Sequence, residues 1–218
     1  METIVERNNV AVDLIRRRDF APTVQILSET LRLFQDQLAV NPSSFSVSSL
    51  QEASGSMNNC LDEGILLPHV DESRVDEFFT GKDLFIYDQG IVIPQGLTDA
   101  STMLAILIFN AALSHHLCAN QYPENYSQYL LQARSLYATA YQMQATTSQN
   151  NVLFRVAAIN NAAAIEWEFG NDICCRKLND CLMSIWAISV DQEHSSRVLY
   201  MCNFLWNILR KDDTAGAA

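Results

Sequence analysis

The chain has 218 residues, of which 49% are hydrophobic and 18% are charged, so it can bury the core of one ordinary domain. Its net charge of −11 argues against binding to duplex nucleic acid, because neutralising phosphates requires a basic face. The 7 glycines and 5 prolines are too few for a β-sandwich with many tight turns or for a glycine-rich phosphate-binding enzyme.

Two features bear on the compartment. Residues 1–7 contain no apolar run, so no secretory signal is expected there. Six cysteines occur, two of them adjacent at Cys174 and Cys175 and the others widely scattered. This pattern predicts reduced, mostly buried thiols in an intracellular protein, either cytoplasmic or nuclear.

Residues 8–40 are predicted to form two helices. Apolar residues recur at steps of three and four, as in the series Val24, Leu27, Leu31, Phe34 and Leu38. Asp19 lies between the two helices as a candidate N-cap, and Asn41–Pro42 ends the second helix.

Residues 41–98 form a predicted insertion of different character. It is rich in serine and then in acidic residues. Within it, Leu84–Tyr87 and Ile91–Ile93 are β-prone runs separated by three loop residues that end in glycine, which predicts a hairpin over 84–93. The insertion is either a partly disordered linker carrying this hairpin, or a segment whose apolar residues pack on the helices and shield their groove.

Helical periodicity returns after residue 98 and predicts an all-α chain. The expected helices span residues 99–119, 125–145, 150–169, 172–189 and 195–210. The stretch 100–123 has no Asp, Glu, Lys or Arg, but Asn110, Ser114 and His116 lie in its second half. These polar residues favour a buried helix over a membrane-spanning one.

Asparagine and alanine recur at matching points of three helices. In each, an asparagine precedes an alanine by two residues: Asn9 and Ala11, Asn110 and Ala112, and Asn161 and Ala163. The following helix carries three positions at steps of four and three, occupied by Thr23, Leu27 and Thr30, by Ala133, Tyr137 and Ala140, and by Cys175, Asn179 and Leu182. Small residues at such positions let antiparallel helices approach, and a large one fills the space between pairs.

These patterns resemble the tetratricopeptide repeat, a helix–turn–helix unit of 34 residues. Ala11, Ala112 and Ala163 match the small residue of its first helix. Residues 109–117 and the alanine-rich end of the chain are also similar to a group of tetratricopeptide-like proteins common in diatoms. The resemblance implies helix hairpins stacked as a right-handed superhelix.

On this basis the chain is predicted to be a single tetratricopeptide-like domain over residues 1–218. The predicted parts are a first repeat at 1–40, the insertion at 41–98, second and third repeats at 99–190, a capping helix at 191–211 and a flexible tail at 212–218. A cap is expected because each repeat buries its apolar face only against its neighbours.

The recurring asparagines are the main candidate for a binding site. A carboxamide donates and accepts hydrogen bonds at once, so Asn9, Asn110 and Asn161 suit the backbone of an extended partner peptide. The same side chains are equally suited to tying each helix to the neighbouring pair, and both interpretations stay open. The family resemblance adds further groove residues, which gives the predicted partner-binding set Asn9, Arg16, Phe109, Asn110, His116, Asn160, Asn161, Trp167 and Glu168.

No metal, cofactor or catalytic set is predicted. His115 and His116 are adjacent on a helix and cannot both face one metal, so we expect His116 in the groove and His115 packed beneath its neighbours. Cys174, Cys175 and Cys181 lack the spacing of zinc ligands. No serine–histidine–aspartate order or phosphate-binding glycine loop can be identified.

The predicted function is a non-catalytic scaffold or adaptor that holds a peptide or helix of a protein partner in a helical-repeat groove. Neither nucleic acid nor membrane insertion is expected, and the oligomeric state stays open. One alternative is an all-α enzyme with His115, His116, Glu166 and Glu168 as acid–base groups. Another is an accessory subunit of a larger assembly.

Overall fold

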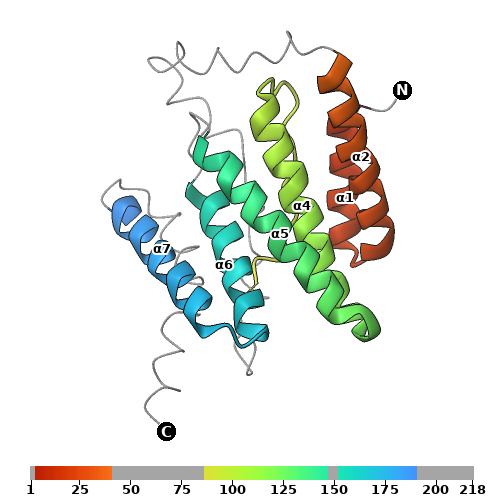
Figure 1. Ribbon diagram of the computed structural model, residues 1–218. Coiled ribbons are helices and arrows are strands. Elements are labelled where there is room, and N and C mark those ends of the chain that lie inside the picture. The colour runs from red at the N-terminus through yellow and green to blue at the C-terminus, as the bar shows by residue number, and fades with distance from the viewer. Residues whose placement is uncertain (1–2, 41–85, 147–151, 191–218) are drawn as a thin grey trace, which may run out of the picture. The chain divides into compact units, whose positions relative to one another are not determined.

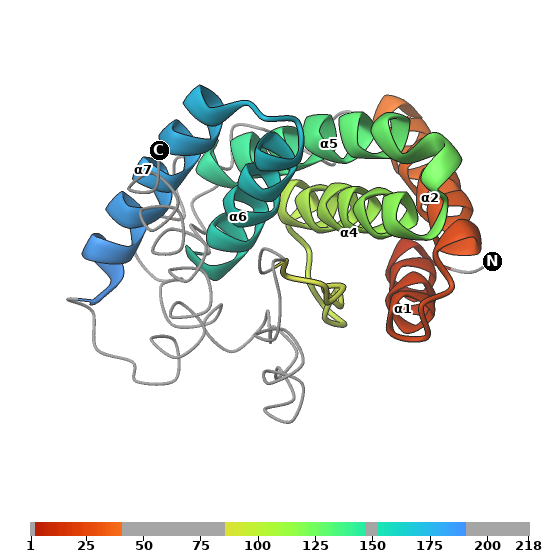
Figure 2. The same cartoon turned by 90° about the horizontal axis from the view of Figure 1, so that it is seen from below.

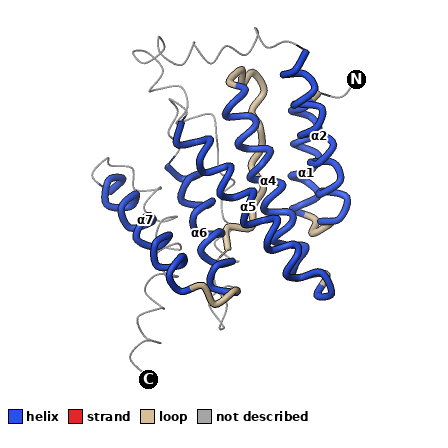
Figure 3. The backbone as a smooth tube through the Cα atoms, in the orientation of Figure 1, coloured by secondary structure: helices blue, strands red, loops and turns tan. Residues whose placement is uncertain are grey.

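Residues 3–40, 86–146 and 152–190 are described by the computed structural model, and they are almost entirely helical (Figure 1; Figure 3). The α-helices of this part are α1 (Ile4–Arg16), α2 (Phe20–Val40), α4 (Ala100–Gln121), α5 (Tyr126–Thr146), α6 (Val152–Glu168) and α7 (Asp172–Val190), and a 3-10 helix, η3 (Pro123–Asn125), precedes α5. The predicted all-α class is therefore confirmed. The predicted capping helix, the tail and most of the predicted insertion lie outside the described residues.

The chain divides into two compact units. Of the described residues, the first unit contains 3–40 and 88–146, and the second contains 86–87 and 152–190. Each unit buries apolar residues of its own helices. The single-domain organisation expected from the sequence stays a prediction.

Side-chain caps fix where two of the helices begin. Thr3 Oγ1 accepts a hydrogen bond from the Glu6 N–H (3.2 Å), and Glu6 Oε2 accepts one from the Thr3 N–H (2.6 Å). This reciprocal capping box satisfies donors that the first turn of α1 leaves unpaired. Asp99 caps α4 by accepting from the N–H groups of Ser101 and Thr102.

The two helix hairpins α1–α2 and α6–α7 have the same turn. Arg18 (φ 61°) and Gly170 (φ 66°) both adopt the left-handed conformation, each as the second residue after the end of the first helix of the pair. The next residue closes the turn in each case, because the Asp19 N–H donates to the Leu14 carbonyl (2.9 Å) and the Asn171 N–H donates to the Glu166 carbonyl (2.8 Å). Arg18–Asp19 and Gly170–Asn171 are therefore conformationally equivalent.

In the first unit, α4 is the central helix. It packs against α5 and α2, and α2 packs in turn against α1. Figure 2 shows α4 between α5 on one side and the segment that precedes α4 (yellow) on the other. The small and large residues expected at helix contacts are all fully buried here: Ala11, Thr23, Leu27, Thr30, Ala112, Ala133, Tyr137 and Ala140.

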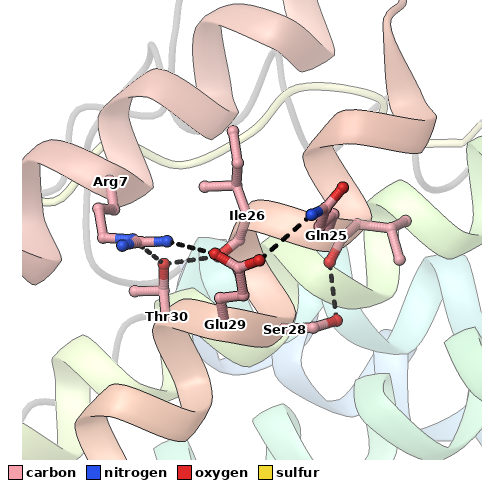
Figure 4. A network of polar contacts seen from close by, with 7 residues as sticks. Arg7, Gln25, Ile26, Ser28, Glu29 and Thr30 are labelled. Carbon is pink, nitrogen blue, oxygen red and sulfur yellow. Dashed lines mark hydrogen bonds and ion pairs between the residues drawn. The ribbon is translucent and has the colours of Figure 1, made fainter.

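A polar network joins α1 to α2 (Figure 4). Arg7 donates from Nε to Thr30 Oγ1 (3.1 Å) and from Nη2 to Glu29 Oε2 (2.8 Å). The buried Thr30 hydroxyl donates to the Ile26 carbonyl (2.6 Å), and Gln25 supports Glu29 from the preceding turn. These bonds give the buried Thr30 hydroxyl both a donor and an acceptor, and they link α1 to α2.

In the second unit, α6 packs against α7, and the residues at the positions of the repeat pattern are buried. Ala163, Cys175 and Leu182 are buried, and Asn179 is only 7% exposed. The small–large–small alternation is thus weak in sequence at α7, but its three positions still face the core.

α4 is the helix of the described chain that is long and apolar enough to cross a membrane. Within the protein, however, 78% of its apolar window is buried. Asn110, Ser114 and His116 are among its buried residues. This burial agrees with the expected core helix.

The hairpin expected at 84–93 is not confirmed. Residues 86–93 form no β-strand, and residues 84 and 85 lie outside the described chain. The backbone groups of Tyr87, Ile91 and Ile93 bond instead to asparagine side chains.

Candidate functional site

Asn110 binds both backbone groups of one residue in the segment that precedes α4. The Ile91 N–H donates to Asn110 Oδ1 (2.8 Å), and Asn110 Nδ2 donates to the Ile91 carbonyl (2.8 Å). Asn110 is fully buried in the middle of α4, and Ile91 is fully buried as well. A single carboxamide thus replaces the hydrogen bonds that a neighbouring strand would supply to Ile91.

Asn9 does the same for Ile93, two residues further along the segment. The Ile93 N–H donates to Asn9 Oδ1 (3.1 Å), and Asn9 Nδ2 donates to the Ile93 carbonyl (3.3 Å). Asn8 connects the two pairs, because it donates to the Ile91 carbonyl (3.1 Å) and accepts from Asn110 Nδ2 (2.8 Å). We call Asn8, Asn9 and Asn110 the asparagine clamp of the first unit.

The second unit holds one residue in the same way. The Tyr87 N–H donates to Asn161 Oδ1 (2.8 Å), and Asn161 Nδ2 donates to the Tyr87 carbonyl (2.9 Å). Asn160 lies beside it, fully buried, and donates to Asn161 Oδ1 (3.3 Å). All three asparagines that recur in the sequence therefore bind extended backbone, and here that backbone belongs to the same chain.

Close packing against α1 accompanies the clamp. A Cβ atom at Gly90 would lie 3.0 Å from Ile15 Cδ1 and 3.1 Å from Val12 Cγ2, so any side chain here would require these α1 side chains to shift by a few tenths of an ångström. Ile91 and Ile93 are fully buried and Val92 is half-buried. The segment is thus held by apolar contacts as well as by hydrogen bonds.

Two predicted binding residues lie in the core instead of on a binding face. Phe109 is fully buried, and its ring meets Tyr137 of α5 edge-on at 5.6 Å between centroids. His116 is 2% exposed and meets the same tyrosine at 6.0 Å. The prediction placed His115 in the packed interior and His116 in the groove, but His116 is the more deeply buried side chain and His115 is only half-buried. His115 and His116 are adjacent in the helix, and the apolar periodicity of the sequence did not show which of the two faces the core.

The remaining predicted residues lie at helix ends. Arg16, in the last turn of α1, forms an exposed ion pair with Asp13 (2.9 Å). Trp167 is 38% exposed in the last turn of α6, and Glu168 follows it at the surface. A role for these residues in partner binding stays a prediction.

The buried imidazole predicts a dependence of stability on pH. Burial lowers the pKa of His116 from 6.5 to about 4, because the charged form loses its hydration. The unfolded chain takes up this proton below about pH 6.5, whereas the folded protein excludes it until about pH 4, so acid favours unfolding between these values.

We expect His116→Leu to remove up to roughly 3 kcal/mol of the loss in free energy of unfolding between pH 6.5 and 4. Urea denaturation of both proteins across this range measures the difference. If the two proteins show the same pH dependence, the imidazole is not buried in its neutral form.

The cysteines and histidines form no metal site in the described residues, where no group of three potential ligands occurs. Cys118, Cys174, Cys175 and Cys181 are free thiols. Burial raises the pKa of Cys118 to about 11, which keeps this thiol protonated and poorly nucleophilic. In the second unit, Glu166 accepts a hydrogen bond from Asn171 Nδ2 (2.8 Å) and so supports the turn after α6.

Two clamp features were missed by sequence reasoning. Asn8 was overlooked, although the Asn8–Asn9 doublet repeats the Asn160–Asn161 doublet and was a usable signal. Gly90 was interpreted as a turn residue, and only the tertiary structure shows that it permits close approach to α1.

Compared with known proteins, the chain matches no family model, and no curated protein or solved structure is significantly similar to it.

Proposed function

We propose that the protein is a non-catalytic interaction scaffold that binds an extended segment of a partner protein through its backbone-binding asparagines. The observation that carries the proposal is the pairing of Asn110 with both backbone groups of Ile91 at 2.8 Å. Such two-point contacts recognise an extended chain whatever its side chains are. In the described conformation the protein's own residues 88–93 take the place of the partner.

The proposal includes a tetratricopeptide-like arrangement of the helix hairpins. It is supported by the equivalent turns at Arg18 and Gly170 and by the burial of the small residues at matching positions. It is also supported by the asparagines at corresponding points of α1, α4 and α6, each of which binds backbone in the same manner.

Because residues 88–93 of the same chain bind the clamp, a partner segment has to compete with them. A tethered segment is present at an effective concentration of about millimolar, so an external peptide with equal contacts binds weakly until the tethered one is released. The partner is thus expected either to bind more tightly than residues 88–93 or to bind after their release.

The test is binding of a labelled peptide, residues 88–95, to the full chain carrying Ile91→Ser and Ile93→Ser. These substitutions weaken the internal segment without altering the clamp. We expect the variant to bind the peptide at least roughly 100-fold more tightly than the unmodified protein does, measured by fluorescence anisotropy.

Circular dichroism checks the fold of the variant. If the variant is unfolded alone, binding is measured as recovery of helical signal on adding peptide. A variant that neither binds the peptide nor regains helicity with it contradicts the proposal. So does equal binding after the further change Asn110→Ala.

A further inference from the structure

The spacing of the clamp defines how an occupant must lie in the first unit. Asn110 and Asn9 bind the backbones of Ile91 and Ile93, which are two residues apart. Residues two apart in an extended chain direct their side chains to the same face. Both isoleucines are fully buried, whereas Val92 between them is half-buried. The site therefore selects side chains at two alternate positions and leaves the middle one less constrained.

The position before the first isoleucine is constrained by size. At Gly90 an added Cβ would meet Ile15 Cδ1 at 3.0 Å and Val12 Cγ2 at 3.1 Å, distances that require the α1 side chains to move. A larger side chain would have to displace α1 or lift the neighbouring residue off Asn110. Glycine is thus preferred for its lack of a side chain.

We infer that the partner segments bound by the first unit are extended and carry the pattern glycine, aliphatic, any residue, aliphatic, as in Gly90–Ile93. The inference deepens the proposed function and rests on it. Backbone contacts from the clamp set the register, and the two aliphatic side chains and the glycine set the specificity. Charged residues at either aliphatic position are excluded, because an ion buried there would lose its hydration.

A matched series of peptides tests this pattern. The host is the full chain with Ile91→Ser and Ile93→Ser, and the parent peptide is residues 88–95. Single peptides carry Ile91→Thr, Val92→Thr or Ile93→Thr, so that the same polar β-branched residue is placed at each position, and a fourth carries Gly90→Val.

We expect Ile91→Thr, Ile93→Thr and Gly90→Val to weaken binding by roughly tenfold or more, and Val92→Thr by less than about threefold. Fluorescence anisotropy of the labelled peptides gives each dissociation constant. If the parent binds and all four variants bind equally well, the specificity pattern is wrong while the proposed function stands. If the parent itself does not bind or restore helicity, the proposed function fails and the inference fails with it.

Discussion

Replacing Asn110 by alanine is expected to lower the free energy of unfolding by about 2–4 kcal/mol. The substitution removes the acceptor of the Ile91 N–H and the donor to Asn8 Oδ1, two buried polar groups. The Ile91 carbonyl keeps its bond from Asn8, which limits the loss. Urea denaturation followed by circular dichroism at neutral pH measures this difference.

Asn120→Ala is the matched control, because Asn120 is exposed near the end of the same helix. It is expected to change the free energy of unfolding by less than about 0.5 kcal/mol. Equal effects of the two substitutions would show that Asn110 does not support the segment as described.

Phe109→Ala is expected to lower the free energy of unfolding by about 3–5 kcal/mol. The Phe109 side chain is fully buried between α4 and α5, and its edge-on contact with Tyr137 is lost together with its apolar area. Thermal and urea unfolding of the purified variant measure the loss.

Phe109→Ala also distinguishes a role of Phe109 in the core from a role in partner binding. Leu131→Ala, on the exposed side of α5, serves as control and is expected to cost less than about 1 kcal/mol. A Phe109→Ala protein with undiminished stability that has lost peptide binding would return Phe109 to the partner-binding set.

Local signals were sufficient to predict the helices. Within the described residues, the apolar periods and the break at Gly170 agree closely with the helices. For the recurring asparagines, one of the two open interpretations was binding to the backbone of a partner peptide, because a carboxamide has both a donor and an acceptor. In the structure they bind backbone of the same chain, and binding to a partner stays a prediction.

The segment that binds the clamp could not be predicted from the sequence, because the contacts join residues that are far apart in the chain. Asn9 and Ile93 are 84 residues apart in the chain, so their pairing has no periodic signature. A hairpin was predicted over residues 84–93 because of the Asp–Gln–Gly sequence between two β-prone runs. In the described part of this segment, the backbone groups of Tyr87, Ile91 and Ile93 bond to asparagine side chains. The alternative that the segment packs on the helices is the one that these contacts favour.

Hydrogen exchange at the Ile91 and Ile93 amides tests the central claim most directly. Both N–H groups donate to asparagine oxygens in the clamp, whereas Gln95 is exposed. We predict that both amides exchange at least roughly a hundredfold more slowly than that of Gln95, and that Asn110→Ala selectively accelerates Ile91. Rapid exchange of both amides in a protein whose α4 amides remain protected would contradict the account.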